Sequence, residues 1–121
     1  METVAFISTE NGDDLIVSFA VIEPADPTEI DSLTLLRTPK YEHLLGDWER
    51  GVRVSFDRSV EDDDELLEEL HLDGKSAVVR LTTSRRNYEL DIRKVDEGEI
   101  KAMRKVLVRM NYDRRIRLFG V

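Results

Sequence analysis

The sequence predicts an α+β fold: an antiparallel, strongly bent sheet of six to eight short strands with one long amphipathic helix near the C-terminus. Two observations lead to this prediction. Most of the chain consists of short runs in which apolar and polar residues alternate, which is typical of strands. One stretch, residues 95–111, instead repeats its apolar residues at steps of three and four, which is typical of a helix. Because a single helix cannot supply the crossovers of a parallel sheet, we expect antiparallel pairing.

The 121 residues are expected to form a single domain, 1–121, because no repeat, low-complexity tract or linker divides them. The hydrophobic fraction of 40% is sufficient for a real core. The chain has no cysteine, so a disulfide framework and thiolate metal ligands are excluded. It also shows no signal-peptide pattern and no apolar run of about 18 residues. We therefore expect a cytoplasmic protein without a membrane span.

Three strands are expected in the first third of the chain. The dipeptide Asn11-Gly12 marks a turn after the first of them, and Pro24 and Pro27 interrupt the chain after the second. The second run is apolar on both faces, which indicates a central strand that is covered on both sides. The expected strands are Val4–Thr9, Leu15–Glu23 and Leu33–Arg37.

The stretch 38–51 shows no strand alternation. Four of its apolar residues are spaced by three and four positions, which fits either a short helix or a structured loop. These residues are Tyr41, Leu44, Leu45 and Trp48. After it, Val52–Phe56 has the clearest half-buried strand pattern in the chain, with apolar side chains at every second position.

A hairpin and two further strands are expected in the second half. Leu67–Leu72 and Ala77–Thr82 flank Asp73-Gly74, a dipeptide that suits a two-residue type I′ turn. A helix over residues 63–70 is the competing interpretation, since its leucines also fit a helical step. The remaining expected strands are Tyr88–Val95 and Arg114–Val121.

The helix prediction for residues 95–111 depends on its end signals as well as its period. Asp96 is placed to cap the helix by accepting from the backbone N–H of Glu99, whose own side chain can reach back to the cap. Asn111 is suited to a left-handed residue that ends the helix. The expected apolar stripe comprises Ile100, Met103, Val106, Leu107 and Met110. The opposite face carries Lys101, Arg104, Lys105 and Arg109.

Charge is distributed unevenly along the chain. Residues 1–73 contain 20 Asp and Glu against 5 Lys and Arg, a net charge of −15, whereas residues 74–121 contain 6 against 13, a net charge of +7. Two outcomes are open: the charges pair within the fold, or they form opposed acidic and basic faces. The whole-chain charge of −8 opposes binding to a nucleic acid, because distant carboxylates repel a polyanion.

No motif indicates catalysis, so we expect a protein that is not an enzyme. The sequence contains no nucleophile elbow, no phosphate-binding glycine-rich loop and no ligand spacing around His43 or His71. The acidic run 61–65 lacks the spacing of a calcium-binding loop. We therefore predict no catalytic residues, no metal site and no cofactor.

Two stretches are predicted to bind a partner protein. Tyr41, Trp48 and Arg50 belong to residue types that dominate binding hot spots, and they lie in the least regular part of the chain. The alternative for the two aromatic residues is that they pack beneath the loop as a satellite core. The second stretch is an acidic patch that would meet a basic partner, with a merely solvated loop as its alternative. Its residues are Asp62, Asp63, Asp64 and Glu65.

The segments RGVRVSFD (50–57) and NYELDIRKVDEGEIKAMRKVLVRM (87–110) resemble the immunity protein 10 family of bacterial polymorphic toxin systems. These two segments are structural motifs, and no binding residue is transferred through them. The resemblance implies a small acidic α+β protein that neutralises a toxin by binding it. We therefore expect a non-catalytic binding protein whose partner is another protein, such as a basic toxin domain. The alternative is a self-associating structural or regulatory domain, which would form a homodimer.

Overall fold

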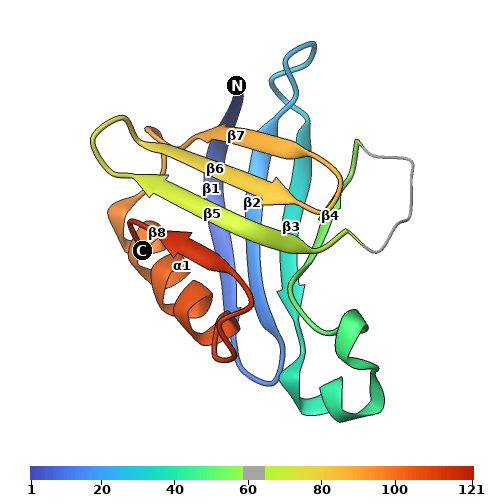
Figure 1. Cartoon of the computed structure of the whole chain (residues 1–121). Coiled ribbons are helices and arrows are strands. Elements are labelled where there is room, and N and C mark those ends of the chain that lie inside the picture. Colours follow the sequence, from blue (N-terminus) through green and yellow to red (C-terminus); the bar gives the residue numbers. More distant parts are fainter. Residues whose placement is uncertain (59–64) are drawn as a thin grey trace.

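The computed structural model describes residues 1–58 and 65–121, and it contains eight strands, one α-helix and two short 3-10 helices within them (Figure 1). The first group of strands comprises β1 (Glu2–Asn11), β2 (Leu15–Ile22), β3 (Ile30–Arg37) and β4 (Arg53–Phe56). The 3-10 helices η1 (Pro39–Leu44) and η2 (Asp47–Glu49) lie between β3 and β4. The later elements are β5 (Leu67–Asp73), β6 (Val78–Thr83), β7 (Asn87–Asp91), α1 (Glu97–Met110) and β8 (Arg117–Phe119).

All eight strands form one mixed sheet in the order β4-β3-β2-β1-β7-β6-β5-β8. The α+β class and the single helix near the C-terminus are thus confirmed, but the expectation of an antiparallel, strongly bent sheet is wrong. Two of the pairings, β1 with β7 and β5 with β8, are parallel. The sheet does not curl strongly either. Instead, strands β1–β4 and strands β5–β7 run in different directions, as two groups that cross in Figure 1.

The two groups of strands meet at two places. At the first, the start of β1 pairs with the end of β7 through Glu2 and Thr3 only. At the second, Arg53 of β4 forms an isolated bridge with Leu66, just before β5. Between these junctions the inward-facing apolar side chains of both groups form one hydrophobic core.

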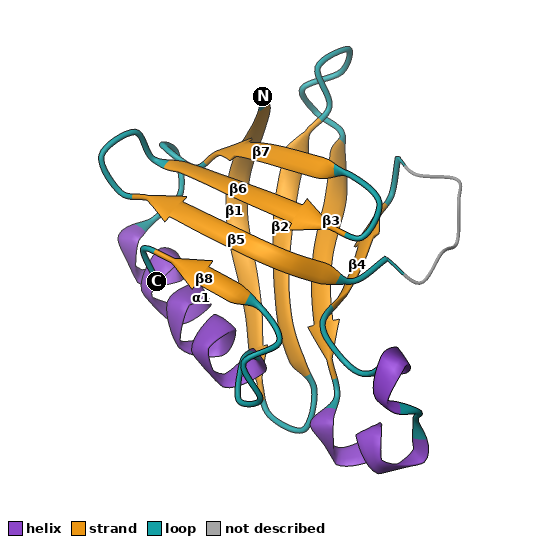
Figure 2. Cartoon of the chain, viewed as in Figure 1, coloured by secondary structure: helices purple, strands orange, loops and turns teal. Residues whose placement is uncertain are grey.

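Helix α1 packs against β1 and β2 and closes the core on one side (Figure 2). Its buried residues are Met103, Val106, Leu107 and Met110, as the periodicity predicted. Ile100, the fifth residue of the expected stripe, is only partly buried and packs at the margin of the core. No helix in the described part of the chain combines the length and the apolar character needed to cross a membrane.

The ends of the helix differ from the prediction. The Asp96 carboxylate accepts from the N–H of Gly98, not from that of Glu99. Glu99 does not reach back to the cap, because its Oε1 accepts the N–H of Ile7 in β1 at 2.7 Å. Asn111 is not left-handed (φ −96°), and its side chain instead bonds both backbone polar groups of Ile116. The N-terminal end therefore keeps a local cap from Asp96 and adds a bond to β1, and the C-terminal end is bonded to the segment that leads to β8.

The β5–β6 hairpin is confirmed, and the competing helix over residues 63–70 is wrong within its described part. The turn is longer than the predicted type I′ turn, because Asp73 pairs with Val78 and four residues lie between them. The Asp73 carboxylate accepts the N–H groups of Lys75 and Ser76, and Ala77 adopts φ 54°. A side chain that bonds its own turn in this way favours the longer loop.

Candidate functional site

The candidate site is the η1–η2 segment, residues 39–49, which leaves the sheet at the end of β3 and returns to it at β4 (Figure 2). Pro39 stands at the start of η1 and ends the strand, because proline lacks the N–H that a ladder requires. Three large apolar side chains of this segment are exposed: Tyr41 by 55%, Leu44 by 73% and Trp48 by 78%. This exposure rules out the alternative that the two aromatic residues form a satellite core.

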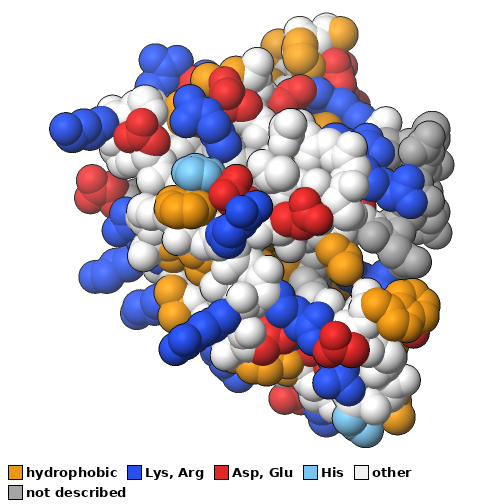
Figure 3. Space-filling model, in the orientation of Figure 1, with side chains coloured by type: hydrophobic (Ala, Val, Ile, Leu, Met, Phe, Trp, Pro, Cys, Tyr) orange, Lys and Arg blue, Asp and Glu red, His pale blue; other side chains and the backbone are white. Residues whose placement is uncertain are grey.

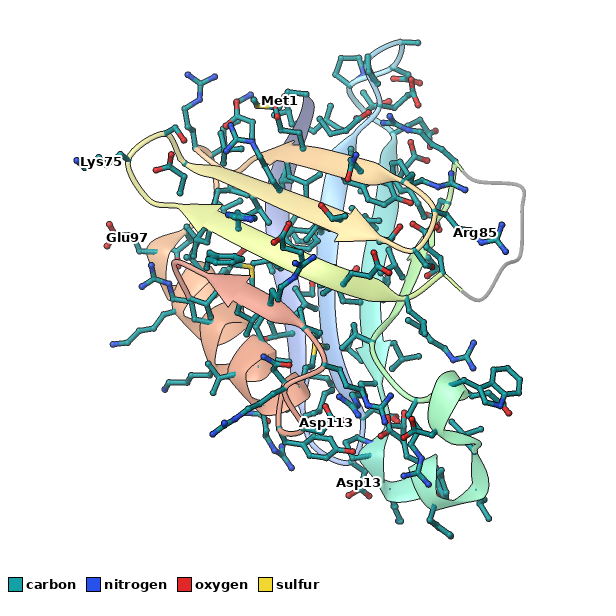
Figure 4. All side chains as sticks on the ribbon, in the orientation of Figure 1. Met1, Asp13, Lys75, Arg85, Glu97 and Asp113 are labelled. Atoms are coloured by element: carbon teal, nitrogen blue, oxygen red, sulfur yellow. The ribbon has the colours of Figure 1, made fainter. Side chains whose placement is uncertain are left out.

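The segment is fixed to the fold by Arg37, the last residue of β3, which is only 1% exposed. Its Nε and Nη2 donate to the two carboxylate oxygens of Glu42 at 2.7 and 2.8 Å. Nη2 also donates to Asp113 at 2.7 Å, and Nη1 donates to the carbonyl of Met110 at 2.7 Å. One guanidinium therefore joins the end of β3, helix η1 and the C-terminal end of α1. Figure 4 shows Asp113 at this junction.

The charges in this buried cluster compensate one another. Burial disfavours the charge of Arg37, but its hydrogen bonds with Asp113 and Glu42 outweigh that effect and raise its pKa. The hydrogen bond from Arg37 lowers the pKa of Asp113 to about 2, although burial opposes it. Tyr112 completes the cluster: its hydroxyl donates to Glu42 at 2.7 Å, and its ring lies 4.4 Å from the Arg37 guanidinium. Each charged group already has its partners, so the cluster supports structure and offers no free acid or base.

A second arginine holds the other half of the segment. Arg115 Nη2 donates to the Asp47 carboxylate at 2.6 Å, and its Nη1 donates to the Asp47 carbonyl at 3.0 Å. Its Nε donates to Asp113 at 2.6 Å. Arg115 is thereby connected to the buried cluster of Arg37, Glu42, Tyr112 and Asp113, here called the Arg37 cluster. The exposed apolar side chains are thus carried by backbone that is anchored at both η1 and η2.

Two hollows flank the segment. The first, of about 270 Å³, is lined by apolar and charged side chains of β3, η1 and the residues that follow, and its apolar members are Leu36, Tyr41, Leu44 and Leu45. The second, of about 320 Å³, lies on the other side, between η2 and the start of β5. Its lining includes Trp48, Arg50, Leu66, Leu67, Ser84 and Arg115. Figure 3 shows hydrophobic side chains standing out over this part of the molecule, with charged side chains of both signs beside them.

Of the predicted binding residues, Trp48 and Arg50 line the same hollow, whereas Tyr41 lines the other one. Three others, Asp62, Asp63 and Asp64, lie outside the described residues. The surface around Trp48 is not uniformly acidic, because Arg50 and Arg115 line the hollow beside it.

Glu65 was predicted to be part of an exposed acidic patch, but it is 5% exposed. Its carboxylate accepts from the hydroxyls of Thr83 at 2.6 Å and Tyr88 at 2.9 Å, and Arg86 lies within ion-pair distance. Burial and the bond to Glu65 raise the pKa of Tyr88. A carboxylate committed in this way stabilises the junction of β5, β6 and β7 and is not accessible to a partner.

The Arg37 cluster was not predicted, although the sequence carries a signal for it. Arg37 has the same strand parity as Leu33 and Leu35, which places it on the buried face of β3. An inward-facing arginine needs carboxylates nearby, and sequence spacing alone could suggest Glu42 but not the distant Asp113.

The acidic run 61–65, considered above as a metal site, lies outside the described residues except for Glu65. Among the described residues, no three Asp, Glu or His side chains are grouped closely enough to hold a metal ion. His71 stacks on Phe119 with ring centroids 4.3 Å apart, far along the sheet from the η1–η2 segment.

Of the two outcomes considered for the uneven charge, pairing within the fold is present among the described residues, and opposed acidic and basic faces stay a prediction. Ion pairs such as Arg37–Asp113 and Arg115–Asp47 join the acidic and basic parts of the chain. The outer face of α1 remains basic, because no described carboxylate pairs with its cations. These cations are Lys101, Arg104, Lys105 and Arg109.

Comparison of the chain with protein-family models, curated proteins and solved structures finds no match. The resemblance to the immunity protein 10 family therefore stays a prediction from two short segments.

Proposed function

We propose that this chain is a non-catalytic binding protein and that its partner protein docks on the η1–η2 segment. One observation carries the proposal: Tyr41, Leu44 and Trp48 are held outward on a segment whose backbone is anchored by Arg37 and Arg115. Exposed apolar side chains that lie close together on a monomer's surface are a common mark of a protein interface.

The anchoring strengthens this proposal on energetic grounds. A loop that must become ordered on binding loses conformational entropy, and that loss reduces affinity. The η1–η2 segment has already been ordered by folding, through the buried hydrogen bonds of Arg37 and the bonds from Arg115 to Asp47. The free energy gained when a large aromatic side chain such as Trp48 is buried against a partner is then not offset by the cost of ordering the segment.

For the partner, we propose a bacterial toxin domain that the protein neutralises by covering its surface. The resemblance to immunity proteins and the net charge of −8 support this choice. A strongly negative protein attracts a basic partner over distances of about 8–10 Å at physiological salt. The charge then accelerates the encounter, while the apolar segment supplies the contact.

The alternative is self-association through a sheet edge. The edge strand β8 is short, from Arg117 to Phe119, and it carries a charged residue. Both properties are typical of edges that resist pairing with another chain. Light scattering over a range of concentrations tests this alternative: a monomer throughout excludes it, and a concentration-dependent dimer supports it.

The docking proposal is tested with Trp48→Ala and a matched control, Val108→Ala, which removes an apolar side chain that is 60% exposed on the outer face of α1. The partner is captured from native lysate and then purified, and its dissociation constant is measured for each variant. We expect Trp48→Ala to weaken binding by at least about 30-fold, as for a hot-spot residue, and Val108→Ala to leave it unchanged. Equal affinity for the two variants would contradict the proposal.

The electrostatic part has a separate test. The association rate with the purified partner is measured by stopped flow at several salt concentrations. We expect it to fall steeply as salt rises, because screening shortens the range of the attraction. A constant association rate would refute steering by the acidic charge. It would not contradict the proposal that the partner docks on the η1–η2 segment.

A further inference from the structure

We propose that the hollow beside Trp48 holds a carboxylate of the partner, with Arg50 as its main hydrogen-bond donor. This inference rests on the proposed function, since it names the chemistry that the partner brings to the η1–η2 segment. The carboxylate belongs either to an Asp or Glu side chain or to a chain terminus.

Within the described residues, the charge of Arg50 has no compensating partner. No described carboxylate forms an ion pair with it, and its guanidinium donates one hydrogen bond there, from Nη2 to the Leu45 carbonyl at 3.3 Å. Its Nε is buried and has no hydrogen-bond partner. A buried donor left unpaired costs about 1–3 kcal/mol. Because Nε is itself covered, a ligand meets the guanidinium at Nη1 and Nη2, and Nη1 makes no hydrogen bond within the described residues.

The neighbouring arginine shows that this state is specific to Arg50. Arg115 lines the same hollow, but its nitrogens are occupied by Asp47 and Asp113. The Arg115 charge is therefore compensated within the fold, whereas the Arg50 charge is not. Among the described cations of the hollow, Arg50 is the one with donor capacity to spare.

The rest of the hollow suits an acidic residue with an apolar neighbour. Trp48 forms one wall, and Leu66 and Leu67 provide apolar surface. The Ser84 Oγ accepts the N–H of Leu66 at 3.0 Å, so its hydroxyl hydrogen remains available to donate. Arg50 and Ser84 thus offer two donors beside apolar walls, and a volume of about 320 Å³ can hold a side chain.

A carboxylate fits this arrangement better than a phosphate does. The planar arginine fork can pair with two oxygens of either ion, so the charge of the ligand decides between them. A phosphate carries more charge, and the hollow supplies one uncompensated cation together with Glu68, which also lines it. The net charge of −8 further disfavours a polyanion.

The experiment uses the full chain and its own fluorescence, because Trp48 is the sole tryptophan and lines the hollow. The probes are three short peptides of otherwise identical, apolar sequence. The first has a central Glu and an amidated C-terminus, the second a central Gln and an amidated C-terminus, and the third a central Gln and a free C-terminus. Inorganic phosphate is titrated as a fourth probe. A saturable change in Trp48 emission measures binding.

We expect the Glu peptide or the free-terminus peptide to bind at least tenfold more tightly than the amidated Gln peptide, and the tighter of the two identifies the source of the carboxylate. Arg50→Gln should remove this preference, and Arg50→Lys should reduce it, since lysine keeps the charge but loses the fork. The control variant, Lys101→Gln on the outer face of α1, should bind as the wild type does.

Equal binding of the three peptides, tighter binding of phosphate, or an unchanged preference in Arg50→Gln would each overturn the inference. The effects of two variants on binding of the purified partner distinguish a failure of this inference from a failure of the proposed function. If Trp48→Ala loses the purified partner while Arg50→Gln retains it with full affinity, the docking segment is supported and the carboxylate is refuted. If Trp48→Ala retains the partner, the docking proposal itself is refuted.

Discussion

Two arginines at opposite ends of the η1–η2 segment differ in almost every respect. Arg37 is 1% exposed, and each of its guanidinium nitrogens donates to a neighbour. Arg50 lines an open hollow, and its buried Nε has no partner. Both are single cations near the same short helices. The difference lies in the carboxylates that the fold supplies: Glu42 and Asp113 for Arg37, and none among the described residues for Arg50.

This difference separates a charge that stabilises the fold from one that is left for a partner. A buried cation is tolerated only where opposite charges and hydrogen bonds surround it. A cation whose donors are unused gains most from a ligand, because the ligand meets little competition from the protein itself. The segment therefore has a fixed end at Arg37, whose donors are all used within the fold, and an open end at Arg50, whose donors are partly unused among the described residues.

The largest effect is expected for Arg37→Met, which leaves Glu42 and Asp113 close together without their shared cation. Loss of one partner from a buried ion pair costs about 3–5 kcal/mol. Urea unfolding at pH 7 measures the free energy of unfolding. A loss below about 1 kcal/mol would contradict the structural role of Arg37. Adding Glu42→Gln and Asp113→Asn to the variant should restore part of the stability, because the unpaired charges are then removed.

The second-largest effect is expected from acid pH, which protonates Asp113. The pKa of Asp113 is about 2 in the folded protein and 3.8 without its neighbours. The contribution of the ionised carboxylate to the free energy of unfolding is therefore complete above about pH 4 and is lost as the pH falls toward 2. Asp113→Asn should therefore be less stable than the wild type at pH 5, by at most about 2 kcal/mol. The difference in unfolding free energy should narrow at pH 2.5. A difference that is independent of pH would argue against an ionised Asp113 in the cluster.

A smaller loss is expected for Tyr112→Phe. This variant keeps the ring over Arg37 and removes the hydroxyl that bonds Glu42. A single hydrogen bond to a charged group contributes about 1.5–3 kcal/mol when buried, and less here because the tyrosine is 56% exposed. We expect a decrease of about 1 kcal/mol in thermal or urea unfolding. No decrease would show that solvent already replaces this bond.

The smallest effect on stability is expected at the open end. Arg50→Met removes the buried, unpaired Nε, which favours the variant, and also removes the hydrogen bond from Nη2 to the Leu45 carbonyl, which disfavours it. These two effects oppose each other, so stability should not fall by more than about 0.5 kcal/mol. The same urea experiment measures it beside Arg37→Met. A loss comparable to that of Arg37→Met would show that Arg50 supports the fold, and the contrast between the two arginines would then fail.

Local features of this fold were predictable from the sequence, because they depend on neighbouring residues. The apolar run Leu15–Glu23 and the helical period of residues 95–111 both gave elements close to those observed, β2 and α1. The parallel pairings were not predictable in this way. The contact of Glu2 and Thr3 with the end of β7 joins residues almost ninety positions apart, and no local pattern encodes it.

The candidate site was predictable in part for the same reason. Tyr41, Trp48 and Arg50 were identified by residue type and by the irregular stretch that holds them. Glu65 was misassigned because its burial depends on Thr83 and Tyr88, which reach it only after the strands pair. Exposure of a charged residue is a tertiary property, so a run of acidic residues in the sequence does not establish an acidic surface.

The bond between Glu99 and the N–H of Ile7 has a consequence for how the chain is made. Only the first residues of β1 pair with β7, and α1 packs against the strand farther along. During synthesis, β1 leaves the ribosome long before the helix does, and until then its outer backbone groups have no cover. An uncovered strand edge can pair with another chain. We therefore expect the edge of β1 to be open to pairing with another chain until residues 97–110 have emerged.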